Sequence, residues 1–180
     1  MNIKDTEIKD LLTQYKRFVV YGLSPDGSKP SQRVPLFMKS KGYDAVGTYP
    51  GQTEIAGFKI YPKLADVPPE YRKFVDVFRS SDKIPAVVDE VIAAGGVEVL
   101  WLQLGISHPE AEKRAEAAGI KVVSDRCLHI EYEKWMKYNS RLFHLSNNVR
   151  RAMNRAVVHF VFSETLRHHM YFVSRIDLRQ

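Results

Sequence analysis

Short apolar runs alternate with amphipathic segments along the first 138 residues. Five of these runs predict β-strands, at residues 18–21, 43–48, 74–78, 97–102 and 120–124. Apolar residues at helical spacing predict helices before, between and after them, and residues 52–71 are expected to form an irregular connection. Strands that alternate with helices, without hairpin signals, indicate parallel βαβ units. We therefore predict an α/β fold, a doubly wound (Rossmann-like) five-stranded parallel sheet with strand order 3-2-1-4-5.

The loop after the first strand combines turn-forming, hydroxyl and cationic residues. Gly22 can leave the strand through backbone angles closed to other residues, and Ser31 is a favourable N-cap for the next helix. Several backbone amides should then converge, with Ser24 as a hydroxyl donor and Lys29 and Arg33 as cations, which predicts phosphate binding. The alternative is that the same glycine and serines build an ordinary strand-to-helix connection.

The predicted topology places these groups on a shared edge of the sheet. In a parallel sheet every loop that follows a strand opens on the same side, and a ligand is expected where the strand order reverses, between strands one and four. The loops that should line this edge cover residues 22–33, 49–53, 79–83, 103–108 and 125–129.

The common nucleotide motifs do not fit this loop. An NAD site needs Gly-x-Gly-x-x-Gly and an acidic residue at the end of strand two, but here Gly22-x-Ser24-x-x-Gly27 precedes a second strand that ends at Thr48. No Gly-Lys-Ser/Thr of an NTP-binding loop follows the glycines, and the Gly-x-Ser-x-Gly elbow of serine hydrolases is also missing.

The composition limits the size of the domain and the cellular compartment that we expect. With 180 residues, 44% of them apolar and 27% charged, the chain is long enough for one well-buried domain. No apolar run approaches the roughly 20 residues of a membrane span, and the first ten residues lack the apolar core of a secretory signal. The single cysteine, Cys127, excludes an internal disulfide, so we expect a cytoplasmic protein.

The net charge of +6 is concentrated in the tail. Residues 1–138 carry a net charge of +1, whereas residues 139–180 carry +5, so the charge says little about the ligand of the main domain. We expect a C-terminal extension over residues 139–180 that is basic and helical. It could pack on the domain or across a homodimer, and a basic amphipathic helix would also suit a membrane surface or RNA.

Seven short motifs, in order, resemble a known family. They are Val20-Tyr21-Gly22-Leu23-Ser24, Lys29-Pro30-Ser31-Gln32-Arg33-Val34, Ile55-x-Gly57-x-Lys59-x-Tyr61, Leu64-Ala65-Asp66-Val67-Pro68, Val75-Asp76-Val77-Phe78-Arg79, Trp101-x-Gln103-Leu104-Gly105-Ile106 and Asp125-Arg126-Cys127-x-x-x-Glu131. Over roughly residues 5–138 the chain resembles the small stand-alone CoA-binding proteins, which are similar to the N-terminal domain of the succinyl-CoA synthetase α subunit. We therefore expect a CoA-binding Rossmann-like domain over residues 1–138.

The resemblance implies that coenzyme A, or an acyl-CoA, lies extended along the edge of the sheet. By position it implies three groups of contacts: Gly22, Leu23 and Ser24 at the pyrophosphate with Lys29, Ser31 and Arg33 near by; Tyr49 and Pro50 beside the adenine; and Phe78, Arg79 and Ser80 along the pantetheine. Phosphates favour cations and an adenine ring favours a flat apolar partner, so these residue types suit the ligand.

The sequence departs from the family pattern after the second strand. The family usually has Asn-Pro there, often followed closely by Lys or Arg, whereas this chain has Tyr49-Pro50-Gly51-Gln52. If the 3′-phosphate contact of CoA normally comes from that basic residue, this segment lacks it, which leaves open the preference for CoA over dephospho-CoA.

Two functional hypotheses follow. The first is a CoA or acyl-CoA binding protein that is non-catalytic or regulatory, because the phosphohistidine domain of the synthetases has no counterpart here. The second is a redox or acyl-transfer enzyme that uses Cys127, since Arg126 and a helix start beside it favour a thiolate, although a free cysteine is also commonly a buried apolar residue. The spacing of His108, Asp125, Cys127 and His129 matches no metal site.

Overall fold

The computed structural model describes residue 3 and residues 5–136. The chain divides into two units, Met1–Trp135 and Met136–Gln180. The helices and strands described in this section belong to the first unit. The exception is the last residue of the helix at residues 128–136, which belongs to the second unit. The predictions for residues 139–180, including the homodimer, membrane and RNA contacts, lie outside the described residues and stay predictions.

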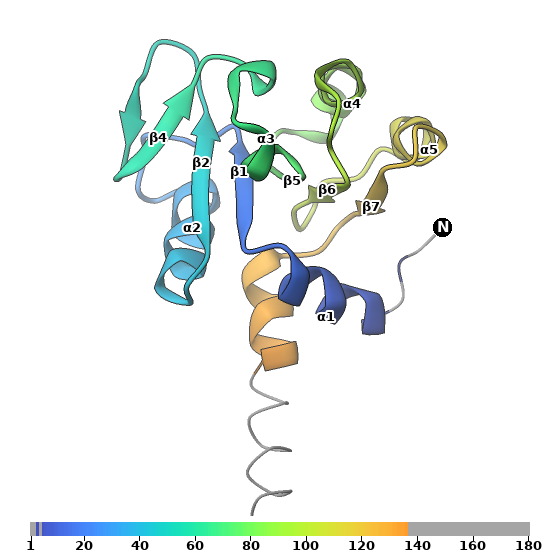
Figure 1. Cartoon of the computed structure of the whole chain (residues 1–180), viewed down its shortest axis with the longest axis horizontal. Helices are drawn as coiled ribbons and strands as arrows, with labels where there is room; N and C mark the ends of the chain where they lie inside the picture. Colours follow the sequence, from blue (N-terminus) through green and yellow to red (C-terminus); the bar gives the residue numbers. More distant parts are fainter. Residues whose placement is uncertain (1–2, 4, 137–180) are drawn as a thin grey trace, which may run out of the picture. The chain divides into compact units, whose positions relative to one another are not determined.

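The described part of the chain alternates between strands and helices (Figure 1). Its strands are β1 (Arg17–Tyr21), β2 (Asp44–Thr48), β3 (Glu54–Ile55), β4 (Phe58–Tyr61), β5 (Phe74–Val77), β6 (Val99–Leu102) and β7 (Lys121–Val123). Its helices are α1 (Asp5–Gln14), α2 (Pro30–Ser40), α3 (Pro69–Arg72), α4 (Ile84–Ala94) and α5 (Pro109–Ala117), with 3₁₀ turns η1 (Leu64–Asp66) and η2 (Ser81–Lys83). A further helix covers residues 128–136.

The Rossmann-like α/β class is confirmed, but the predicted strand number and order are wrong. The sheet has seven strands in the order β3-β4-β2-β1-β5-β6-β7, and all neighbouring pairs are parallel except β3 with β4. Residues 52–71, expected to be irregular, contain β3 and β4. Because β4 occupies the place beside β2, the strand at residues 74–77 lies on the other side of β1. The strand order therefore reverses between β1 and β5.

The missed strands form a hairpin whose turn is weakly encoded in the sequence. Ala56 and Gly57 both have positive φ, 51° and 76°, as the central residues of a type I′ turn do. Alanine rarely adopts this conformation, so the turn lacks the Asn-Gly signature by which such hairpins are usually found. In β4, Phe58 and Ile60 are buried and Lys59 is exposed, which is the alternation of a strand with one covered face.

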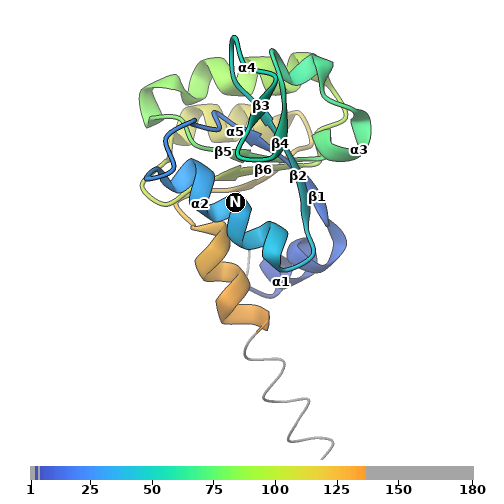
Figure 2. The ribbon, with the colours of Figure 1, turned by 90° about the vertical axis from the view of Figure 1, so that its left-hand side faces the viewer.

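Helices cover both faces of the sheet (Figure 2). On one face, valines and leucines of β1, β5 and β6 pack against the apolar side of α4 and the alanines of α5. Val87, Val88 and Val91 of α4 are buried, whereas Ile92 is 41% exposed and does not face the core. Strands covered on both sides read as continuous apolar runs, which is why β5 and β6 were visible in the sequence.

The opposite face is lined by aromatic rings. Phe18 of β1 packs edge-on against Phe74 of β5, and Phe74 stacks on Trp101 of β6 with ring centroids 5.9 Å apart. Buried residues of α1 and α2, among them Leu12 and Met38, belong to the same side of the sheet (Figure 2). Helix α2 follows β1 on this face, whereas α4 follows β5 on the other, so the loops at the β1–β5 junction diverge.

We predict that Gly47→Ala lowers the free energy of unfolding by about 1–2 kcal/mol. A Cβ atom at this position in β2 would lie 2.7 Å from Ile60 Cδ1 and 3.0 Å from Leu23 Cβ, so these buried side chains would have to shift. Urea denaturation measures the effect. In the control Gly27→Ala, the new Cβ meets only the Gln32 side-chain oxygen at 3.1 Å, so equal destabilisation of the two variants would contradict the packing argument.

Candidate functional site

The junction between β1 and β5 requires a glycine. Gly22 follows β1 with φ of +88°, and a Cβ there would lie 3.0 Å from Arg79 Cδ and 3.3 Å from the Phe78 carbonyl oxygen. Its amide donates to the Thr48 carbonyl at 3.3 Å, which continues the pairing of β1 with β2. Gly22 thus lets the loop after β1 pass directly against the loop after β5.

The loop after Gly22 is held by its own side chains. The Ser24 amide donates to Ser31 Oγ at 3.2 Å, and the Asp26 amide donates to Ser24 Oγ at 3.1 Å. The Ser28 amide donates to Asp26 Oδ1 at 2.9 Å. These amides were expected to converge on a phosphate, but the loop's hydroxyls and carboxylate already accept their hydrogen bonds.

Ser31 is not the N-cap of α2, contrary to the sequence-based expectation. The helix begins at Pro30 and its N-cap is Lys29, which makes no side-chain capping bond. Proline fits the first helical position because its missing N–H would have no helical partner. Ser31 lies inside the first turn, only 6% exposed, and its hydroxyl fixes the loop rather than the helix end.

Most residues of the expected site nevertheless line one cavity. This cavity, called the main cavity here, has a volume of about 850 Å³ and opens at the carboxyl ends of β1, β5 and β6. Nine of the expected residues line it: Gly22, Ser24, Lys29, Ser31, Arg33, Tyr49, Phe78, Arg79 and Ser80. The side chain of Leu23, also expected there, is fully buried and packs beneath Gly47, so it faces the core.

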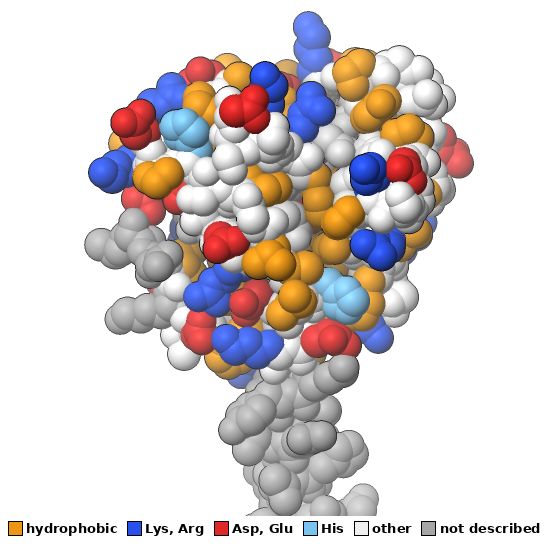
Figure 3. All heavy atoms as spheres, turned by 180° about the vertical axis from the view of Figure 1, so that it is seen from behind, with side chains coloured by type: hydrophobic (Ala, Val, Ile, Leu, Met, Phe, Trp, Pro, Cys, Tyr) orange, Lys and Arg blue, Asp and Glu red, His pale blue; other side chains and the backbone are white. Residues whose placement is uncertain are grey.

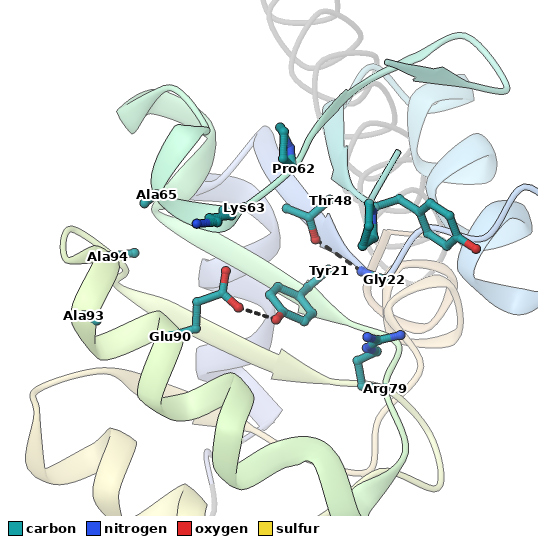
Figure 4. Close-up of a pocket in the computed structure, with 12 residues that line it drawn as sticks. Tyr21, Gly22, Thr48, Pro62, Lys63, Ala65, Arg79, Glu90, Ala93 and Ala94 are labelled. Carbon is teal, nitrogen blue, oxygen red and sulfur yellow. Dashed lines mark hydrogen bonds between the residues drawn. The ribbon is translucent and has the colours of Figure 1, made fainter. Parts of the chain in front are cut away.

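A smaller side cavity of about 490 Å³ adjoins the main cavity (Figure 4). The two share Gly22, Tyr49 and Arg79 as lining residues. Pro50, expected beside the adenine, lines the side cavity. The expected residues are therefore divided between two adjoining cavities along the sheet edge, which is the arrangement that an extended ligand needs.

Three cations, Lys29, Arg33 and Arg79, line the main cavity. Among the described residues, the side chains of Lys29, Arg33 and Arg79 form no ion pair and no hydrogen bond. Elsewhere on the same unit, Arg114 pairs with Asp89 at 2.6 Å and Arg126 with Asp5 at 2.9 Å. Unpaired cations around a cavity favour an anionic ligand.

One wall of the main cavity, called the apolar wall, consists of residues that the sequence did not identify individually. It is apolar and consists of Val34, Leu104, Ile106 and Ile130 together with Cys127. Leu104 and Ile130 are 62% and 56% exposed, the most exposed of the large hydrophobic side chains in the described part of the chain. The expected loops 103–108 and 125–129 pointed to this wall, but an exposed leucine has no distinguishing signal in a sequence. Apolar side chains also gather across the middle of the face in Figure 3, with Lys and Arg near its margins.

A buried carboxyl group lies beneath this wall. Asp76 is fully buried on β5, and its Oδ1 accepts a hydrogen bond from Gln103 Nε2 at 2.7 Å, while its Oδ2 has no partner among the described residues. Gln103 lines the main cavity, and its Oε1 accepts from the Leu128 amide at 3.4 Å. Burial raises the pKa of Asp76 to about 8, despite the opposing hydrogen bond from Gln103.

Cys127 is partly exposed at the start of the last described helix. Its carbonyl accepts from the Glu131 amide at 3.0 Å, which begins the helix at residues 128–136. His129 stacks on Phe37, with ring centroids 3.5 Å apart, and no hydrogen bond links it to Cys127 among the described residues. Cys127 therefore lines the cavity with no hydrogen bond to a histidine among the described residues.

Two kinds of site, a metal site and a membrane span, have no counterpart among residue 3 and residues 5–136. There, no group of three or more His, Cys, Asp and Glu side chains is arranged to hold a metal ion. No helix within the same residues is long and apolar enough to cross a membrane.

Comparison with known proteins identifies the family. Residues 16–133 match the protein family described as a CoA binding domain. The chain belongs to this CoA-binding family. This match confirms the resemblance inferred from the seven motifs. Membership of the family suggests an association with coenzyme A.

Its relatives share the unit that carries the cavities. YneT of Bacillus subtilis, described as an uncharacterized protein, is 30% identical over 131 residues, which is 73% of this chain and 96% of YneT. A solved structure from Thermus thermophilus, cell-free ID.343, is 35% identical with a TM-score of 0.67 and covers 74% of this chain and 99% of its own. A hypothetical protein from Pyrococcus horikoshii OT3 is 30% identical, with a TM-score of 0.69 over 74% of this chain and 93% of its own.

We predict that stability falls between about pH 4 and pH 8 through Asp76, and that Asp76→Asn removes this part of the dependence. The folded chain keeps the proton up to about pH 8, whereas the unfolded chain loses it near the ordinary pKa of 3.8. Over that range the unfolded state binds fewer protons, so the free energy of unfolding decreases as the pH rises.

Urea denaturation of both proteins at pH 5, 6.5 and 8 measures the effect of Asp76. Asparagine keeps an oxygen for Gln103 and has no charge to bury, and carboxyl groups elsewhere titrate equally in both proteins. The variant should therefore gain stability relative to the parent as the pH rises. Parallel pH profiles would contradict a protonated Asp76.

Proposed function

We propose that this protein binds coenzyme A or an acyl-CoA across the two cavities and acts as a non-catalytic, regulatory binding protein. The observation that carries the proposal is the set of unpaired cations Lys29, Arg33 and Arg79 on one cavity at the reversal of strand order. Membership of the CoA-binding family supports the same ligand. In this proposal the diphosphate lies near these cations, and the pantetheine follows Phe78 and Ser80 toward the apolar wall.

The loop chemistry supports side-chain cations rather than backbone amides as the main phosphate ligands. The amides of Ser24, Asp26 and Ser28 already donate within the loop. A charge-assisted hydrogen bond to phosphate is about twice as strong as a neutral one, so three cations can replace the lost amides. The apolar wall beyond them suits a pantetheine arm or an acyl chain, which makes an acyl-CoA an equally suitable ligand.

We expect Arg33→Gln to weaken CoA binding by roughly 10- to 150-fold, because one charge-assisted contact contributes about 1.5–3 kcal/mol. Isothermal titration calorimetry measures the affinity. Lys41→Gln is the matched control: it removes one positive charge just beyond the other end of α2, outside both cavities, and should leave the affinity within about twofold.

A thermal-shift panel of CoA, NAD and ATP tests the ligand class on the unaltered protein. CoA at about 100 times its Kd should add roughly 2.7 kcal/mol to the free energy of unfolding. Stabilisation by NAD and none by CoA would reject the proposed function. A loss of CoA binding in Lys41→Gln equal to that in Arg33→Gln would reject the proposed phosphate site.

A second candidate function is thiol exchange at Cys127. It is favoured by the position of this thiol on the same cavity wall that would receive the end of the pantetheine. In the exchange, the Cys127 thiolate attacks one sulfur of CoA disulfide, the S–S bond breaks, a Cys127–CoA disulfide forms and one CoA thiolate leaves. The Cys127 proton passes to solvent or to that thiolate.

Incubation with CoA disulfide followed by denaturing mass spectrometry tests this second candidate. We expect a single CoA adduct on the unaltered protein and none on Cys127→Ser. A competing excess of CoA thioester should slow adduct formation if the disulfide reacts from the main cavity. An unmodified parent protein would reject thiol exchange while leaving the binding proposal in place.

A further inference from the structure

The side cavity contains a cation that the sequence motifs did not assign. Lys63 and Arg79 approach this cavity from opposite sides, and the Tyr21 and Glu90 side chains lie between them (Figure 4). Among the described residues, the Lys63 side chain forms neither an ion pair nor a hydrogen bond. These are the two Lys or Arg side chains that line the side cavity in the described part of the chain.

The backbone of Lys63 is fixed by the turn in which it lies. The Leu64 amide donates to Glu90 Oε1 at 3.0 Å, and the Asp66 amide donates to the Lys63 carbonyl at 3.2 Å. Leu64 itself is fully buried in the core. Lys63 is therefore anchored at its backbone while its side chain is exposed, which holds an ammonium group at the cavity without a competing carboxylate partner.

The carboxylate of Glu90, which lines the side cavity, already accepts two hydrogen bonds from within the protein. Glu90 accepts from the Tyr21 hydroxyl through one carboxylate oxygen and from the Leu64 amide through the other. Burial and the hydrogen bond to Glu90 raise the pKa of Tyr21, so its hydroxyl remains a donor. Both carboxylate oxygens of Glu90 therefore accept hydrogen bonds within the protein, and neither forms an ion pair with Lys63.

The remaining lining suits a nucleoside. Pro50, Pro62, Ala65 and Ala94 add small and apolar surface to the lining of this cavity, and such a lining accepts a flat ring. The loop at residues 49–52, which follows β2, contributes no charged side chain. A phosphate attached to the nucleoside would therefore find its cation in the turn after β4 and not in the loop after β2.

We propose that Lys63 binds the 3′-phosphate of the adenosine end of CoA and sets the preference for CoA over dephospho-CoA. This inference rests on the proposed function, because it assumes that the adenosine lies in the side cavity and the diphosphate in the main cavity. Lys63 comes from a different loop than the cation that the family usually places after the second strand. In this proposal Lys63 supplies the positive charge that the segment Tyr49-Pro50-Gly51-Gln52 does not contain.

The test is the ratio of two affinities, Kd for dephospho-CoA divided by Kd for CoA, measured by calorimetry at low salt. The unaltered protein should bind CoA about tenfold more tightly, as expected for one charge-assisted contact to phosphate. In Lys63→Gln the ratio should fall to about one, through weaker binding of CoA alone. Lys63→Arg should retain the preference because it keeps the charge.

Lys59→Gln is the matched control. Lys59 lies four positions earlier on β4 and outside both cavities, so its removal changes the net charge equally without removing a proposed contact. Its ratio should equal that of the unaltered protein. Because both ligands are measured on each variant, a general loss of stability affects both affinities and leaves the ratio unchanged.

The possible results separate the inference from the function on which it rests. Binding of neither ligand to the unaltered protein would reject the proposed function itself. Equal binding of both ligands to the unaltered protein, or an unchanged preference in Lys63→Gln, would overturn the role of Lys63 while CoA binding stands. An equal loss of preference in Lys59→Gln would show a general charge effect and would also overturn it.

Discussion

The close approach of the loops after β1 and β5 is the constraint on which the rest of the site depends. These strands are neighbours in the sheet, but α2 continues from β1 on one face and α4 continues from β5 on the other (Figure 2). The two loops diverge from their common edge, and the space between them becomes the cavity. Gly22 makes this possible because any larger residue would collide with Arg79 and the Phe78 carbonyl.

Electrostatics then determines what the cavities can hold. Lys29 and Arg33 come from the start of α2, Arg79 from the loop after β5 and Lys63 from the turn after β4, so four cations from three segments face two adjoining cavities. No acidic side chain among the described residues pairs with them. Like charges brought together around a cavity repel one another, so this arrangement supports the proposed anionic ligand.

A protonated carboxyl group beneath the cavity adds a second physical feature. Asp76 lies on the aromatic face of the sheet, in register with Trp101, and accepts a hydrogen bond from Gln103. Gln103 in turn accepts a hydrogen bond from the Leu128 amide at the start of the last described helix. Burying a charge there would cost several kcal/mol, so the group is neutral below about pH 8. The floor of the main cavity and the start of the helix carrying His129 and Ile130 are thus joined by one short hydrogen-bonded chain.

The sequence by itself determined the fold class, the family and most of the cavity lining. The runs at residues 18–21, 74–78 and 97–102 identified the central strands because strands covered on both faces must be apolar throughout. Nine expected site residues line the main cavity because loops that follow parallel strands open on one edge. These inferences depend on local pattern and on general topology, both of which can be obtained from the order of residues alone.

Only the tertiary structure decided the strand order, the partners of the loop amides and the place of Lys63. The hairpin of β3 and β4 has a turn, Ala56-Gly57, whose conformation depends on its surroundings more than on its residues. The sequence predicted Ser31 as the helix cap, but in the structure the helix begins at Pro30. The Ser31 hydroxyl instead accepts a hydrogen bond from the Ser24 amide. Lys63 joins Tyr49 at one cavity because β4 lies beside β2, a pairing between segments whose contact no local pattern encodes.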